Sequence, residues 1–103
     1  MFKLIYFVPA AQLEQTKLAV FSVGAGRLGN YEHCAWQALG VGQFKPCEGS
    51  QPFIGQQGEL EQVEEYRVEV LVDPACIQQA VAALKAAHPY EEPAYEVIKL
   101  EAF

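Results

Sequence analysis

Two stretches of the chain alternate hydrophobic and polar side chains with the period of two that is typical of β-strands. In residues 2–8, one face carries Phe2, Leu4, Tyr6 and Val8. In residues 65–72, apolar side chains alternate with charged ones. One face carries Tyr66, Val68, Val70 and Val72, and the other carries Glu65, Arg67 and Glu69. Two further strands are predicted, from about His33 to Val41 and from about Ala94 to Leu100. Pro93 suits an edge position for the last strand, because proline cannot donate a backbone hydrogen bond.

Two other segments have the spacing of helices that bury one stripe of side chains. The first is predicted from Ala10 to about Val23, with Leu13, Lys17, Val20 and Val23 along its stripe. Glycine readily adopts the left-handed conformation of a helix C-cap, so the glycines from residue 24 onward are expected to end it. The second helix is predicted to start with Asp73 as N-cap and Pro74 as first helical residue, and Pro89 ends it. Its stripe contains Ile77, Ala80, Val81 and Leu84.

The element order β-α-β-β-α-β predicts a single α+β domain, residues 1–103, of ferredoxin-like fold. In this fold two helices cover one face of a four-stranded antiparallel sheet. The expected core residues are Leu4, Tyr6, Val20, Val68, Val70, Ile77, Val81, Leu84 and Val97. The other sheet face and two edge strands stay open, and such surfaces are commonly covered by further copies of the same chain. We therefore expect a homo-oligomer.

The composition limits the classes of partner and the cellular location that we expect for this chain. The chain has 103 residues, 51% hydrophobic and 19% charged, as in an ordinary globular domain. Its apolar runs are far shorter than the ~18 residues of a membrane span, and the N-terminus lacks a signal-peptide cleavage site. The net charge of −6, without a basic cluster, argues against nucleic acid as a partner. Cys34, Cys47 and Cys76 form no C-x-x-C pair, which indicates free thiols and a cytoplasmic location.

The sequence Gly24-x-Gly26-x-x-Gly29 matches the spacing of a dinucleotide-binding loop. That loop works between a strand and the N-terminus of a helix, whereas here a helix precedes it and a strand follows. A helix cap and turn is therefore the favoured interpretation. A specialised ligand site built from backbone amides is the alternative.

The residues able to bind a metal gather in two places, His33 with Cys34, and His88 with Glu91 and Glu92. Neither group has a diagnostic spacing, and the topology places the two histidines at opposite ends of the sheet, so only a contact between copies brings them together. A surface or capping role is favoured for each histidine, since His88 near a helix C-terminus is electrostatically favourable by itself.

The same residues give weak signals for catalysis. Glu91 and Glu92 are adjacent in a segment expected to be extended, where neighbouring side chains point to opposite sides, so they are not expected to share a substrate. For Cys34, packing is favoured over a nucleophilic role, because no pattern identifies an activating base.

Four motifs taken together resemble the NGG-interacting-factor-three-like family, in order and over nearly the whole chain. They are Val8-Pro9, the stretch from Gly24 to Cys34 with Asn30-Tyr31, Glu48-Gly49-Ser50-x-Pro52-Phe53-Ile54-Gly55, and His88-Pro89-Tyr90-Glu91-Glu92-Pro93-Ala94-Tyr95. The chain is similar to the domain that many bacterial members carry inserted within a larger dinuclear-metal protein. That domain is described as similar to CutA and to the PII signalling proteins.

The likeness to CutA and the PII proteins implies a trimer with ligand sites between the subunits, and a dimer is the next expectation. The larger relatives bind two metal ions through domains that flank the insertion, so a hydrolase or GTP cyclohydrolase activity is not carried over to this chain. The first hypothesis is therefore a binding or regulatory module for a small molecule of unknown identity. Its expected ligand-binding residues are Gly24, Gly26, Asn30, Tyr31, His88, Tyr90, Glu91, Glu92 and Tyr95.

Three alternatives stay open at this point. The second hypothesis is a divalent metal ion bound by His33, Cys34 and His88, since thiolate and imidazole suit thiophilic or imidazole-preferring ions. The third is an enzyme, which ranks lowest because no nucleophile-base pair and no complete metal site are visible. The fourth is a structural partner whose open sheet docks another protein.

Overall fold

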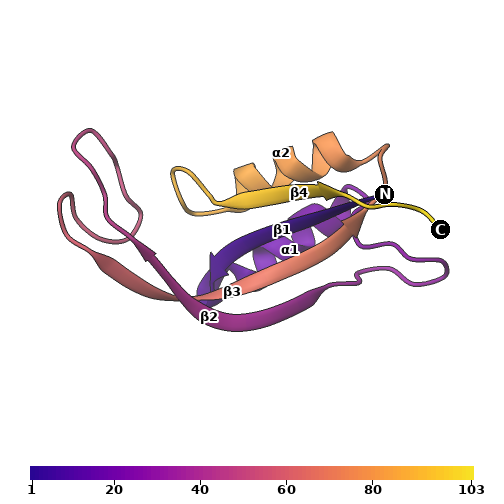
Figure 1. Ribbon diagram of the computed structural model, residues 1–103, viewed down its shortest axis with the longest axis horizontal. Coiled ribbons are helices and arrows are strands. Elements are labelled where there is room, and N and C mark those ends of the chain that lie inside the picture. The colour runs from indigo at the N-terminus through magenta and orange to yellow at the C-terminus, as the bar shows by residue number, and fades with distance from the viewer.

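The computed structural model describes residues 1–103 and shows a four-stranded sheet with two helices on one face (Figure 1). The elements, in chain order, are β1 (Phe2–Pro9), a 3-10 turn (Ala10–Gln12), α1 (Leu13–Ser22), β2 (Trp36–Phe44), β3 (Glu61–Val72), α2 (Ile77–Ala87) and β4 (Tyr95–Lys99). The strand order is β2-β3-β1-β4 and every pairing is antiparallel. The predicted ferredoxin-like fold is thus confirmed. Neither helix has the length and apolar character that crossing a bilayer would need.

The core lies between the helices and one face of the sheet. The period-two pattern of the two central strands produces it, because Leu4 pairs with Val70 and Tyr6 with Val68 in the β1–β3 register, and all four side chains are buried. The helices contribute Leu13, Val20, Phe21, Ala80 and Leu84. Six of the nine expected core residues are buried, and Ile77 and Val81 pack against the core while staying partly exposed.

Val97 was expected in the core and is instead 40% exposed. It pairs with Leu4 and so belongs to the helix side of the sheet, but β4 has a neighbouring strand on one side only. Its position on the edge strand therefore leaves it near the solvent.

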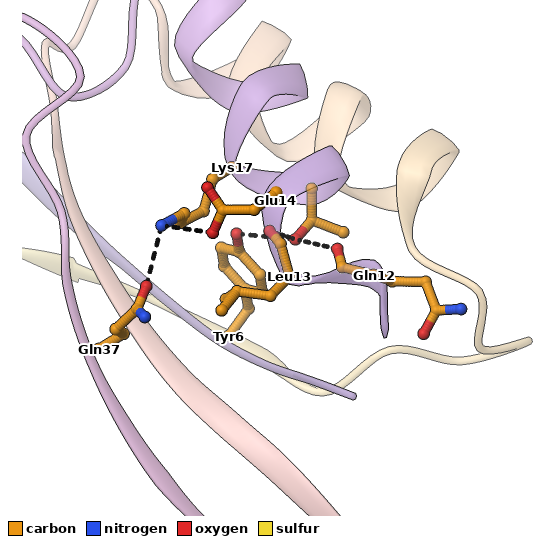
Figure 2. Close-up of polar contacts among 7 residues, drawn as sticks. Tyr6, Gln12, Leu13, Glu14, Lys17 and Gln37 are labelled. Atoms are coloured by element: carbon orange, nitrogen blue, oxygen red, sulfur yellow. Dashed lines mark hydrogen bonds and ion pairs between the residues drawn. The ribbon is translucent and has the colours of Figure 1, made fainter. Parts of the chain in front are cut away.

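A buried polar contact joins the first strand to the first helix (Figure 2). The Tyr6 hydroxyl donates to Thr16 Oγ1 at 3.0 Å, and the Thr16 hydroxyl donates to the backbone oxygen of Gln12 at 3.0 Å or of Leu13 at 2.9 Å. Burial raises the pKa of Tyr6 to about 12, because the charged phenolate would lose its hydration. On the surface, Lys17 bridges Glu14 and Gln37, which links α1 to β2 (Figure 2).

Several element boundaries differ from the prediction, and β3 begins at Glu61, four residues before its predicted start. The first helical segment opens as a 3-10 turn and becomes α-helical only at Leu13. The second helix begins at Ile77, one turn later than expected, although the Asp73 carboxylate accepts the N–H of Ala75 at 2.9 Å in the turn that leads into it. The second strand begins at Trp36, whose partner is Glu69, and extends to Phe44.

The start of β2 was predicted at His33, and the structure shows why it lies later. His33 has a positive φ of 58°, which is incompatible with a strand, and the N–H of Cys34 donates to the backbone oxygen of Gly26 at 2.8 Å. The chain is therefore tied into the turn after α1 until residue 35, and it pairs with β3 only from Trp36 onward.

No helix covers the second face of the sheet, called here the open face. Its central part carries an ion-pair cluster in which Glu69 contacts Lys3 and Arg67, each at 3.1 Å. The hydrogen bond from Lys3, joined by Arg67, lowers the pKa of Glu69 below its usual value. At one end of the sheet, β2, β3 and the loop between them extend beyond the helices (Figure 1).

Candidate functional site

A cavity of about 640 Å³ lies on the open face, where the loop of residues 45–60 and the turn of residues 88–94 meet the sheet. We call it the open-face pocket. Its floor contains Phe7 from β1, Arg67 from β3 and Ala38 and Gly40 from β2. Figure 1 shows the loop and the turn before β4 at the same end of the molecule. The sheet thus supplies a rigid base, and two irregular segments supply the walls.

Two glycines in β2 shape the pocket. A side chain at Gly40 would meet no other atom within 4 Å, so glycine leaves open space there. A Cβ at Gly42 would instead collide with the carboxylate of Glu65. Gly42 therefore allows Glu65 to lie across the strand, while Gly40 keeps the floor of the pocket clear.

Tyr90 lies in the wall of the pocket. Its hydroxyl donates to Glu65 Oε2 at 2.7 Å, and its ring lies 6.0 Å from Phe44 and 6.5 Å from Phe53, measured between ring centroids. Burial raises the pKa of Tyr90, and the hydrogen bond to Glu65 raises it further, because ionisation would place a phenolate beside a carboxylate. Tyr90 thus remains a neutral hydrogen-bond donor at physiological pH.

His88 lies buried behind Tyr90 and fixes the turn. Its Nε2 lies 2.6 Å from the backbone oxygen of Phe7, which can only accept, so Nε2 carries the proton and donates. Nδ1 is then free to accept the N–H of Tyr90 at 3.1 Å. Burial lowers the pKa of His88, outweighing the hydrogen bond to Phe7, which raises it. Both ring nitrogens are engaged, so His88 positions Tyr90 rather than facing a ligand.

Glu91 and Glu92 line the same pocket. The expectation of an extended segment is wrong, because residues 90–92 form a bend, and both glutamates line one pocket. Glu91 Oε1 accepts the N–H of Gln51 at 3.1 Å, which ties the loop of residues 45–60 to the turn before β4. The two walls of the pocket are therefore joined to each other.

Tyr95 lies on the opposite side of the sheet from the pocket. It packs against the core, and the ammonium of Lys85 lies 5.3 Å from the centroid of its ring. Of the residues expected in the last motif, the structure brings Tyr90, Glu91 and Glu92 together at the pocket and leaves Tyr95 away from it.

The glycines after α1 serve the turn itself. Gly24 and Gly26 have φ values of 105° and 78°, and the N–H of Gly26 donates to the backbone oxygen of Leu71 at 2.7 Å. A Cβ at Gly26 would come within 2.7 Å of the Phe21 ring and 2.9 Å of the backbone oxygen of Cys34. This geometry matches the cap and turn favoured from the sequence.

Asn30 and Tyr31 lie at the tip of the same turn, beside a second, smaller cavity of about 330 Å³. This cavity also contacts Arg27 and Glu32, and the side chain of Tyr31 is 75% exposed. Tyr90, Glu91 and Glu92 thus line the open-face pocket, and Asn30 and Tyr31 line the second cavity. The other residues expected to bind a ligand line neither, namely Gly24, Gly26, His88 and Tyr95.

The candidate metal ligands are also apart. The His33 ring stacks on Phe21 with ring centroids 4.8 Å apart, near the end of β3 that carries Leu71. His88 contacts the backbone of Phe7 in β1. Leu71 pairs with Lys3, which lies four residues before Phe7 on the same strand, so the two histidines lie at different positions along the sheet. No three His, Cys, Asp or Glu side chains of this chain gather in a way that could hold a metal ion.

Several pocket residues were not expected from the sequence, above all Gly40, Gly42 and Glu65. Phe53 was likewise absent from the residues expected to bind a ligand. The sequence signal that could have indicated this site is the pair of glycines in β2, since a glycine within a strand often marks the close approach of another group.

Comparisons with known proteins agree with this architecture. A protein of Halalkalibacterium halodurans described as a GTP cyclohydrolase 1 type 2 homolog is 46% identical over 100 residues, which cover 97% of this chain and 27% of that protein. The solved structure of a Bacillus cereus protein related to NIF3 matches with a TM-score of 0.84 and 39% identity, over 98% of this chain and 26% of the other. No family model matches the sequence.

A PII-like protein, CutA from a Nostoc species, matches with a TM-score of 0.69 and 18% identity, over 98% of this chain and 82% of that protein. At this identity the match shows the fold alone. The class of protein is thus a ferredoxin-like domain of CutA and PII-like architecture. The chain corresponds to one domain of the NIF3-related proteins to which it is similar, since it spans only 27% of the length of the curated relative described above. The resemblance inferred from the motifs is confirmed.

Proposed function

We propose that this chain is a small binding or regulatory module that works as an assembly of identical copies and holds a small molecule in the open-face pocket. The observation that carries the proposal is the pocket itself. Its volume of about 640 Å³ suits a small organic ligand, and its lining combines apolar side chains with a few fixed polar groups.

Gly40 supports the same function. Glycine within a strand weakens the strand, and Gly40 has an ordinary backbone conformation with empty space around it. Neither a turn nor a close contact inside the chain requires glycine there. Space for a ligand above the sheet accounts for it.

The two edge strands support assembly. Trp36, Leu39 and Val41 on β2 and Val97 and Ile98 on β4 are exposed apolar side chains, next to backbone groups that have no partner strand. An uncovered edge of this kind favours pairing with another chain. We expect a homo-oligomer, with a trimer favoured and a dimer next, and a protein partner docked on the open face as the alternative.

The test compares Gly40→Leu, which fills the floor of the pocket, with Gly40→Ala, which also removes the glycine but adds little volume. Each protein is dialysed to equilibrium against a bacterial metabolite extract, and retained compounds are identified by mass spectrometry. Wild type and Gly40→Ala are expected to enrich at least one compound that Gly40→Leu does not. Equal retention by all three proteins would contradict a ligand site at this place.

Metal binding through His33, Cys34 and His88 stays a prediction, as does the cytoplasmic location. A site using these residues needs ligands from more than one copy, and His88 would have to give up one of its two backbone contacts. The activity in the name of the larger relatives is not part of the proposal, because the binding role rests on the pocket alone.

A further inference from the structure

The open-face pocket is lined by more acidic side chains than basic ones. Its lining includes the carboxylates Glu65, Glu91 and Glu92 and a single basic residue, Arg67. The Nε of Arg67 lies 3.1 Å from Glu69, outside the pocket lining. The other ion pairs of the chain join Lys3 to Glu69 and Lys17 to Glu14. No cationic side chain therefore pairs with the three carboxylates of the pocket.

Two of these carboxylates are held in fixed positions. Glu65 is placed by the space that Gly42 leaves and by the hydroxyl of Tyr90, which donates to it at 2.7 Å. Glu91 accepts the backbone N–H of Gln51 at 3.1 Å. These neutral donors orient the carboxylates without cancelling their charge.

Aromatic rings from three segments meet at the same place. Phe44 comes from the end of β2, Phe53 from the loop that follows it, and Tyr90 from the turn before β4, with ring centroids 6.0 and 6.5 Å from that of Tyr90. All three rings line the pocket. Aromatic faces attract cations, and the attraction grows where water is excluded.

From this geometry we propose that the ligand of the open-face pocket is an organic cation, an ammonium group carried on an apolar or aromatic body. The carboxylates and aromatic faces bind the ammonium, and the apolar lining holds the body. This inference rests on the proposed function, because it names the class of ligand that the pocket takes. It disfavours phosphorylated ligands, since three carboxylates and only one guanidinium line the pocket, and that guanidinium also contacts Glu69.

Three probes with one aromatic ring each and different charge test the proposal: benzyltrimethylammonium, benzyl alcohol and phenylacetate. Binding to the full chain is followed by chemical-shift changes of the backbone amides. The ammonium is expected to bind about tenfold more tightly than the alcohol, and phenylacetate the most weakly. The preference for the ammonium should fall as the salt concentration rises, because the pocket opens to solvent.

Two double variants that remove the same charge test whether the preference for the ammonium arises in the pocket. Glu91→Gln/Glu92→Gln is expected to weaken binding of benzyltrimethylammonium by about three- to tenfold and to leave benzyl alcohol unchanged. Glu64→Gln/Glu101→Gln removes the same charge from exposed positions outside the pocket and is expected to bind all three probes as the wild type does.

The outcomes separate this inference from the function on which it rests. If the alcohol or phenylacetate binds as tightly as the ammonium, or the ammonium shifts no pocket amide at millimolar concentration, the cation proposal is wrong. The pocket function nevertheless stands if Gly40→Leu still abolishes retention of compounds in the dialysis experiment. If both double variants weaken the ammonium equally, net charge and not the pocket determines the preference, which also overturns the inference.

Discussion

At the scale of single residues, the hydrogen bond from Tyr6 to Thr16 holds β1 against α1 inside the core. We predict that Tyr6→Phe lowers the free energy of unfolding by about 1 kcal/mol at pH 7, the usual net loss for one buried hydrogen bond. Urea unfolding measures it. Tyr31→Phe is the control, because this hydroxyl lies on an exposed side chain, and it should change stability by less than about 0.5 kcal/mol.

The same variant has a predicted pH dependence. The unfolded chain releases the phenolic proton near pH 10, whereas the folded protein holds it until about pH 12. Because the folded state binds the proton more tightly, the stabilisation is complete below pH 10 and is lost as pH rises toward 12. The stability advantage of the wild type over Tyr6→Phe should therefore shrink between about pH 10 and 12. A constant difference would argue against burial of the neutral hydroxyl.

His88 gives the opposite sign of pH dependence. Its pKa is lowered in the folded state, so its contribution to stability is complete above the ordinary value and is lost as pH falls below it. Protonation of Nδ1 would also remove the acceptor for the N–H of Tyr90. We predict that urea midpoints fall more steeply below about pH 6.5 for the wild type than for His88→Gln. His33→Gln, which removes a ring without hydrogen bonds, should keep the wild-type slope.

The sequence allowed part of the site to be predicted and not the rest. Tyr90 and its two acidic neighbours stood out because they follow one another in a motif. Glu65 and Phe44 could not be recognised in this way. Glu65 resembles any charged residue on the polar face of a strand, and Phe44 resembles any apolar residue at the end of one. Their role depends on how the loop of residues 45–60 folds back over the sheet, and a local pattern does not encode that path.

At the scale of elements, the turn after α1 depends on Gly26. We predict that Gly26→Ala destabilises the fold by at least about 2 kcal/mol, because it combines a positive φ with close approach to Phe21 and Cys34. Gly29→Ala is the matched control: it has a positive φ of 57° but no atom within 4 Å of a Cβ, so it should cost about 1 kcal/mol. Thermal unfolding compares them, and equal costs would show that the close contacts do not matter.

The elements themselves were predictable because their periodicity is strong where burial is one-sided. The alternation of β3 and the stripe of α2 both reflect one face turned to the core. The boundaries of β2 were harder to predict from the sequence, since contacts with residues elsewhere in the chain determine both of its ends. One is the bond from Cys34 to Gly26, and the other is the pairing of Phe44 with Glu61.

At the scale of the whole molecule, the proposed assembly would use the exposed edge of β2. We predict that Val41→Lys, at a side chain 69% exposed, converts the assembly to monomers without unfolding the chain, because a charge on an edge strand opposes pairing. Leu18→Lys, at an exposed position of α1, should leave the assembly intact. Light scattering measures both masses, and circular dichroism checks that each variant is folded.

The first experiment to perform is native mass spectrometry of the chain, purified without chelator, since one spectrum reports the number of subunits and any small molecule they retain. We expect an assembly of several copies that carries added mass, and the same assembly without that mass for Gly40→Leu. A bare monomer, or added mass that persists in Gly40→Leu, would contradict an assembled protein that binds its ligand in the open-face pocket.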